Sequence, residues 1–301
     1  MTKEEVRARL AELKAARRAI ILAHNYQYGE IQDVADFVGD SLELSQKAAV
    51  VDAEVIVFCG VHFMAETAAI LAPQKTVLLP DAGAGCPMAD MITAAELRAW
   101  KERYPGRKVV CYVNTSAEVK AESDVCCTSA NALRVVESIP DQEVLFVPDK
   151  NLAAFVARRT GKKIIAWDGY CYIHHHIHPA DILAKKKLYP GAEVWAHPEC
   201  RPEVIDLADK ALSTGQMIRE ARQTDKREVI VATEAGIIYR LKKENPGKEF
   251  YPAKDGSLCA NMKKTTLPKV LAALEDMKTR IVVPAEVRRR ALGAIEKMIA
   301  L

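Results

Sequence analysis

The stretch Asp81-Ala-Gly-Ala-Gly-Cys86-Pro-Met-Ala-Asp-Met91 decides the fold. It follows an apolar run over residues 75–80, which predicts a buried strand that ends in an aspartate and a glycine-rich turn with one cysteine. The same arrangement recurs at Asp168-Gly-Tyr-Cys171 and at Asp255-Gly-Ser-Leu-Cys259, each time after another apolar run. The three cysteines are 85 and 88 positions apart. This even spacing predicts an internal threefold repeat with one cysteine in each copy.

The rest of the chain fits three copies of one unit. Each copy opens with a predicted amphipathic helix, over residues 2–18, 93–103 and 179–188. Short apolar strands are predicted next, over residues 19–23, 108–113 and 192–196. A second helix is predicted to begin near a hydroxyl residue, at Ser41, Ser129 and Thr214. Further strands are predicted over residues 54–57, 143–146 and 228–231.

Apolar strands that alternate with helices are typical of parallel sheets covered on both faces. We therefore expect an α/β protein of three similar three-layer α/β/α domains with short parallel sheets, arranged about a pseudo-threefold axis. The expected domains are residues 1–91, 92–177 and 178–262, with a C-terminal helix over 266–301 docked on the first. Ligands of open α/β sheets bind beyond the carboxyl ends of the strands, so we expect the three strand ends to face one cavity.

Composition argues against a nucleic-acid or membrane partner. The 301 residues are 50% hydrophobic, which is enough for a large core. The net charge of +3 is small for a nucleic-acid-binding surface but suits a small anionic substrate. The N-terminal residues lack the apolar segment of a signal peptide, and no apolar run reaches the roughly 20 residues that span a bilayer. We therefore expect a cytoplasmic protein whose thiols stay reduced.

Three thiolates that meet at one axis can hold a metal centre. On zinc, three cysteines leave a fourth position for water, as in a catalytic site. On a [4Fe-4S] cluster they leave one iron free to bind a hydroxyl or carboxylate. Each cysteine alone would be read as a small core residue, and it is their repetition in glycine-rich loops that favours ligands. The remaining cysteines are expected to be core residues: Cys59, Cys111, Cys126, Cys127 and Cys200.

Several polar residues follow the predicted strands. We favour functional roles for His24 and His197, which lie at strand ends. Glu199, beside His197, is the best candidate for a general base. The run His174-His-His176-Ile-His178 is typical of a metal-binding tract. Adjacent histidines point in different directions, however, so we expect this run to lie mostly on the surface or behind the residues that contact a ligand.

The hydroxyl residues at the helix starts have two compatible interpretations. Ser and Thr are common N-caps. Helix N-termini that face a cavity also bind carboxylates or phosphates through free N–H groups.

Eight motifs resemble those of the quinolinate synthase family, in the same order. They are Ala23-His-Asn-Tyr-Gln27, Gly39-Asp-Ser41, Gly85-Cys-Pro-Met-Ala-Asp-Met91, Tyr112-Val-Asn-Thr-Ser116, Cys127-Thr-Ser-Ala-Asn131, Gly169-Tyr-Cys171, His197-Pro-Glu-Cys200, and Asn261-Met262 after Cys259. The motifs fall in all three units, so the resemblance covers nearly the whole chain.

The resemblance implies an enzyme of NAD biosynthesis that condenses iminoaspartate (iminosuccinate) with dihydroxyacetone phosphate to give quinolinate, phosphate and water. It implies that Cys86, Cys171 and Cys259 ligate a [4Fe-4S] cluster whose fourth iron is open to substrate and acts as a Lewis acid. Functional coupling to L-aspartate oxidase is also implied.

The resemblance also implies roles for residues around the cluster. Tyr26 and Glu199 are implied as the acid–base pair, with His197 as a further catalytic residue. The implied substrate contacts are His24, Ser41, Tyr112, Val113, Asn114, Ser129, His197, Pro198, Glu199 and Thr214.

Two other functions are compatible with the same motifs. The first is a zinc-dependent lyase or hydrolase that uses the same three cysteines. The second is a non-catalytic iron–sulfur sensor, although such a sensor needs an output module and the three units occupy the sequence.

Overall fold

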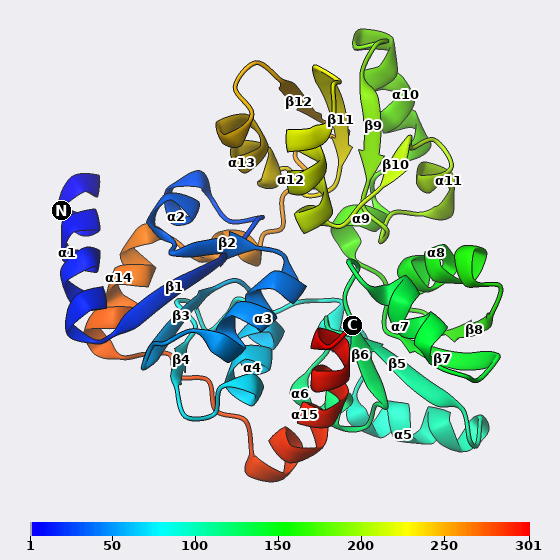
Figure 1. Cartoon of the computed structure of the whole chain (residues 1–301), viewed down its shortest axis with the longest axis horizontal. Helices are drawn as coiled ribbons and strands as arrows, with labels where there is room; N and C mark the ends of the chain where they lie inside the picture. Colours follow the sequence, from blue (N-terminus) through cyan, green and yellow to red (C-terminus); the bar gives the residue numbers. More distant parts are fainter. Residues whose placement is uncertain (1) are drawn as a thin grey trace.

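The computed structural model describes residues 2–301. It contains three four-stranded parallel sheets flanked by helices, and Figure 1 shows them around a common centre. The α/β class and the three-unit architecture predicted from the sequence are confirmed. The boundaries at residues 91, 177 and 262 stay predictions.

The strand order is the same in all three sheets, with the first strand of each unit paired between the second and the third. The first sheet comprises β1 (Ala19–His24), β2 (Phe37–Gly39), β3 (Val55–Cys59) and β4 (Thr76–Leu78). The second comprises β5 (Lys108–Tyr112), β6 (Val125–Cys127), β7 (Glu143–Val147) and β8 (Lys163–Ala166). The third comprises β9 (Glu193–Ala196), β10 (Lys210–Ala211), β11 (Glu228–Ala232) and β12 (Glu249–Pro252).

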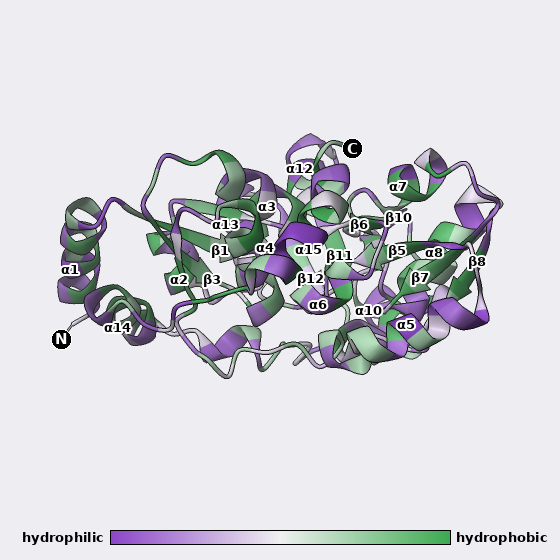
Figure 2. Ribbon diagram, turned by 90° about the horizontal axis from the view of Figure 1, so that it is seen from below, coloured by the Kyte–Doolittle hydropathy of each residue, from purple (hydrophilic) through white to green (hydrophobic). Residues whose placement is uncertain are grey.

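The central strands are buried because their sequences are almost entirely apolar. Every residue of β3 is buried, and so are five of the six residues of β1. Figure 2 shows hydrophobic residues along the strands inside the layers and hydrophilic residues on the helices outside. The edge strands β2, β6 and β10 are only two or three residues long, which is too short for a recognisable apolar run.

Helices connect successive strands. The first unit holds α1 (Lys3–Ala16), α2 (Gly29–Val34), α3 (Ser41–Val50), α4 (His62–Leu71) and the 3₁₀ turn η1 (Ala89–Met91). The second holds α5 (Ala94–Arg103), α6 (Ala117–Ala121), α7 (Ala132–Ser138), α8 (Lys150–Thr160) and α9 (Tyr172–His175). The third holds α10 (Pro179–Leu188), α11 (Pro202–Ile205), α12 (Thr214–Gln223), α13 (Ile237–Glu244) and the 3₁₀ turn η2 (Met262–Lys264).

Helices begin at or near the three predicted hydroxyl residues, as expected, but these residues are not the N-caps. Asp40 caps α3 and Ser213 caps α12, so Ser41 and Thr214 are the first helical residues rather than the caps. Ser129 lies in the turn before α7, whose N-cap residue is Asn131. Since neighbours occupy the cap positions, these three hydroxyls do not act as caps, and the Thr214 hydroxyl instead accepts a hydrogen bond from Asn25 Nδ2 at 3.2 Å.

The C-terminal segment, predicted as one helix over 266–301, forms two. The first, α14 (Leu267–Asp276), packs on α1 at the outer edge of the first unit, whereas α15 (Ala285–Ile299) contacts α6, β6 and α4 (Figure 1). The segment therefore touches the first two units. No helix in residues 2–301 is both long and apolar enough to cross a membrane.

Candidate active site

A cavity lies where the carboxyl ends of the three sheets meet. All three units contribute side chains to its wall, as the geometry of parallel sheets predicts. The lining residues predicted from the sequence are His24, Tyr26, Ser41, Cys86, Tyr112, Asn114, Ser129, Cys171, His197, Glu199, Thr214 and Cys259. Val113 and Pro198 are not among the lining side chains; Val113 is buried, and Pro198 borders a separate depression beside Ser129.

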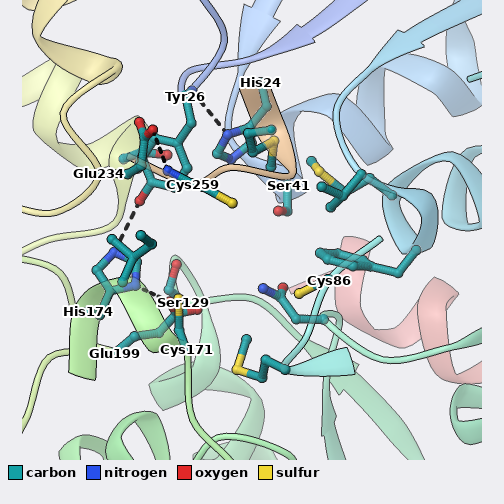
Figure 3. Close-up of a pocket in the computed structure, with 18 of the residues that line it drawn as sticks. His24, Tyr26, Ser41, Cys86, Ser129, Cys171, His174, Glu199, Glu234 and Cys259 are labelled. Carbon is teal, nitrogen blue, oxygen red and sulfur yellow. Dashed lines mark hydrogen bonds and ion pairs between the residues drawn. The ribbon is translucent and has the colours of Figure 1, made fainter. Parts of the chain in front are cut away.

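The three repeated cysteines face this cavity. Cys86, Cys171 and Cys259 are free thiols, each in the loop after the last strand of its unit. Figure 3 shows their sulfur atoms on different sides of the same open space. The structure thus brings together three residues that lie 85 and 88 positions apart in the chain.

The surroundings of these sulfurs fit a metal centre. The backbone amides of Met88 and Ala89 act to lower the pKa of Cys86, and that of His174 acts to lower the pKa of Cys171. Burial nevertheless raises the pKa of Cys86 to about 12 and that of Cys171 well above its ordinary range. A bound metal supplies the positive charge that keeps such buried cysteines as thiolates.

The distances between the ligand atoms distinguish a site for a single metal ion from a site for a larger metal centre. A four-coordinate zinc with bonds of about 2.3 Å brings its sulfur ligands within about 4 Å of one another. Within residues 2–301, the group of three or more such ligand atoms that all lie within 4.8 Å of one another belongs to Cys171, His174 and Glu199. This set contains one of the three cysteines, so the three sulfurs are spread more widely than the ligands of one ion.

Glu199 is the centre of a buried polar network. Its carboxylate accepts a hydrogen bond from the Tyr112 hydroxyl, pairs with His174 Nδ1, and lies 3.8 Å from His197 Nδ1. Burial raises the pKa of Glu199, but the charges of His174 and His197 and the bonds from His174 and Tyr112 outweigh it. Together they lower this pKa to about 2, so Glu199 is ionised at neutral pH.

His174 connects Glu199 to Tyr26. The Tyr26 hydroxyl lies 2.5 Å from Thr233 Oγ1 and 3.3 Å from His174 Nε2, while the other ring nitrogen of His174 faces Glu199. Burial and the charge of Glu199 raise the pKa of Tyr26 well above its ordinary value. The two residues implied as an acid–base pair are therefore bridged by an imidazole.

The prediction that the run His174–His178 lies mostly on the surface or behind the residues that contact a ligand is wrong for His174. It is only 2% exposed and lines the cavity, whereas His176, two residues later, is exposed. The available signal was its position three residues after Cys171, because α9 begins at Tyr172 and one helical turn returns the side chain toward the same side.

His24 and His197 occupy equivalent places at the ends of β1 and β9. In each, Nδ1 accepts a hydrogen bond from the backbone N–H two residues later, that of Tyr26 at 3.2 Å and that of Glu199 at 3.3 Å. Burial lowers the pKa of both histidines to about 3. Both rings are therefore neutral at pH 7, and the acceptor role of Nδ1 places the ring proton on Nε2.

The other five cysteines lie apart from the cavity wall. They are fully buried: Cys59 in β3, Cys111 in β5, Cys126 and Cys127 in β6, and Cys200 after β9. Their positions agree with the prediction that they are core residues.

Comparisons with known proteins agree on one family. The family described as "Quinolinate synthetase A protein" matches residues 8–300. The chain is 64% identical over 299 residues to a quinolinate synthase of Dehalococcoides mccartyi, with 99% of each chain covered. It is 56% identical over 301 residues to one of Thermodesulfovibrio yellowstonii, covering 100% of this chain and 98% of the relative. It is 53% identical to quinolinate synthase 1 of Methanosarcina acetivorans, covering 100% and 99%.

Proposed function

Because the chain belongs to the quinolinate synthase family, we propose that it condenses iminoaspartate with dihydroxyacetone phosphate to give quinolinate, phosphate and water. The observation that carries this proposal is the convergence of Cys86, Cys171 and Cys259 on one cavity that also holds the Glu199 network. The reaction belongs to NAD biosynthesis, and we place it in the cytoplasm.

We propose that Cys86, Cys171 and Cys259 would hold a [4Fe-4S] cluster. Iron–sulfur clusters are bound by cysteine thiolates, and the wide spacing of these sulfurs favours a cluster over a single zinc ion. When bound, the cluster supplies a Lewis acid, because three protein ligands leave one iron open to substrate.

The polar wall of the cavity suits a dicarboxylate substrate. Ser41 and Thr214 are the first residues of α3 and α12 and line the cavity, where the positive end of each helix dipole favours anions. His24 and His197 present protonated Nε2 groups, and Asn114 and Ser129 add further donors. Such donors orient carboxylates and stabilise the charge that develops on a leaving phosphate.

The Glu199 network suits proton transfer. Glu199 is ionised and can accept a proton, whereas Tyr26, with its raised pKa, stays protonated and can donate one. His174 lies within hydrogen-bond distance of Tyr26 through Nε2 and pairs with the Glu199 carboxylate through Nδ1, so its ring provides a route between them. We therefore propose Glu199 and Tyr26 as base and acid, His174 as the bridge, and His197 as the residue that packs on His174 with ring centroids 4.4 Å apart.

Quinolinate formation tests the proposal directly. Anaerobically purified protein would be given dihydroxyacetone phosphate and iminoaspartate, the latter generated in the same vessel by L-aspartate oxidase acting on aspartate. The expected result is quinolinate formation that requires both substrates and stops when the iron is removed. Iron-loaded protein that forms no quinolinate would contradict the proposal, and colourless protein with full activity and bound zinc would favour the zinc enzyme instead.

A further inference from the structure

Two buried carboxylates lie beside the loops that carry Cys171 and Cys259. Asp149 follows β7 and Glu234 follows β11, and both residues are 0% exposed. They are 85 positions apart, which is the spacing of the repeat. Their equivalence indicates a shared role in the second and third units.

Asp149 binds the backbone of the Cys171 loop. The Cys171 N–H donates to Asp149 Oδ2 at 3.1 Å, while the Leu152 N–H at the start of α8 donates to Oδ1 at 2.7 Å. Both oxygens are therefore acceptors from backbone N–H groups. Asparagine has one acceptor oxygen and would turn its NH₂ group toward one of these donors.

Glu234 binds the Cys259 loop in the same way. The Cys259 N–H donates to Oε1 at 2.9 Å, and the Gly236 N–H donates to Oε2 at 2.6 Å. Lys263, whose side chain is 9% exposed, forms an ion pair with Oε1 at 3.1 Å. A glutamine at this position could satisfy only part of this set.

The first unit is built differently. The repeat, counted from Glu54, Glu143 and Glu228, places Gly60, not a carboxylate, at the position that corresponds to Asp149 and Glu234. The carboxylate of the first loop is Asp81, which is partly exposed, accepts from the Gly83 N–H at 2.7 Å and pairs with Lys269. The buried clamp is thus a property of the Cys171 and Cys259 loops.

We propose that Asp149 and Glu234 are positioning residues that fix the peptide groups of Cys171 and Cys259 and so hold both sulfurs ready to bind the cluster. The inference rests on the proposed function, since it takes both cysteines as cluster ligands. Groups behind metal ligands orient those ligands, and their loss typically lowers metal affinity about 10- to 100-fold. A buried N–H left without an acceptor would favour rotation of the loop away from its present position.

The test measures the rate at which anaerobic, full-length protein loses iron to a ferrous chelator. Asp149→Asn and Glu234→Gln are each expected to lose iron about tenfold faster than wild type. Asp168→Asn and Asp255→Asn are matched controls, because these aspartates lie in the same two loops with side chains 89% and 79% exposed. Both controls are expected to lose iron at the wild-type rate.

Two further measurements separate positioning from general damage. The electron paramagnetic resonance spectrum of the reduced cluster should change in Asp149→Asn and Glu234→Gln and stay unchanged in the controls, while circular dichroism verifies that each preparation is folded. Glu234→Asp keeps the charge beside Lys263 but is one methylene shorter, so it should lose iron as fast as Glu234→Gln. Wild-type release from Glu234→Asp would overturn the role of the Cys259 contact.

The outcomes distinguish this inference from the proposed function. Wild-type protein that assembles no iron–sulfur cluster would overturn both. Wild-type protein that holds a cluster, with the two clamp variants matching it in iron release and in spectrum, would overturn the inference alone.

Discussion

The cysteines of the three strand-end loops and those of the strands differ in what surrounds them. Cys86 lies in the loop after β4, and its side chain lines the cavity. Cys111 lies within β5, opposite Cys126 of the neighbouring strand β6 in the sheet register, and is 0% exposed. Cys86, which follows the end of a strand, thus lines the cavity, whereas Cys111, within a strand, belongs to the hydrophobic core.

Serine substitutions should have the largest effect, and they test which of the two groups of cysteines holds the cluster. Cys86→Ser, Cys171→Ser and Cys259→Ser should each lose essentially all cluster iron, because serine does not replace a thiolate ligand. Cys111→Ser, from inside the second sheet, should keep the wild-type amount. Iron and acid-labile sulfide per chain measure both effects. If Cys111→Ser lost as much iron as the three loop variants, the ligand assignment would be wrong.

The second prediction separates ligands from other residues of the cavity wall. Glu199→Gln keeps the shape of the side chain but removes the charge that accepts a proton, so turnover should fall by about 10² to 10⁴. Its iron content should equal that of wild type, because Glu199 is not a proposed ligand. Quinolinate formation and iron content measured on one preparation decide the point; wild-type turnover would reject the assignment of the base.

Two neighbouring histidines, His174 in the cavity wall and His176 on the surface, allow a third test. His174→Gln should lower turnover by about 10- to 100-fold, because it breaks the bridge from Tyr26 to Glu199. His176→Gln changes an exposed residue two positions away and should leave turnover unchanged. Steady-state rates at saturating substrate test this pair, and equal losses in both variants would point to damage of α9 rather than to the bridge.

Much of this arrangement could be predicted from the chain. The helix predicted over residues 179–188 coincides with α10, and the strand predicted over 19–23 is β1 with one residue added. The apolar runs are long enough there to show their period. The repeat spacing also predicts that the three cysteines meet at one cavity, where the structure places them.

Other parts could not be predicted because they depend on side-chain positions and loop contacts that only the folded chain fixes. The cap role of Asp40, rather than Ser41, depends on which side chain reaches the N–H groups of Leu42 and Glu43. The place of His174 depends on one turn of a four-residue helix. Asp149 and Glu234 share the repeat spacing, but their role appears only when the Cys171 and Cys259 loops fold back on them.

The smallest predicted effect concerns pH and the two cavity histidines. Burial lowers the pKa of His24 and His197 to about 3, whereas the unfolded chain titrates near about 6.5. The unfolded state therefore binds more protons between these values, and the free energy of unfolding falls as pH falls through that window. From about pH 7.5 to about pH 6 the loss should be about 1 kcal/mol for each histidine.

Urea unfolding at the two pH values measures this loss. His197→Gln should show a shallower pH dependence than wild type, and His176→Gln, at the exposed site, should behave as wild type. An unchanged pH dependence in His197→Gln would contradict a neutral, buried His197.

The most direct test of the central claim is the Mössbauer spectrum of ⁵⁷Fe-loaded anaerobic protein, recorded with and without quinolinate. Three cysteine ligands on a [4Fe-4S] cluster predict one iron that is distinct from the other three and whose signal alone shifts when quinolinate binds. A protein that contains zinc and no iron would contradict the account. So would a cluster in which no iron signal changes when quinolinate is added.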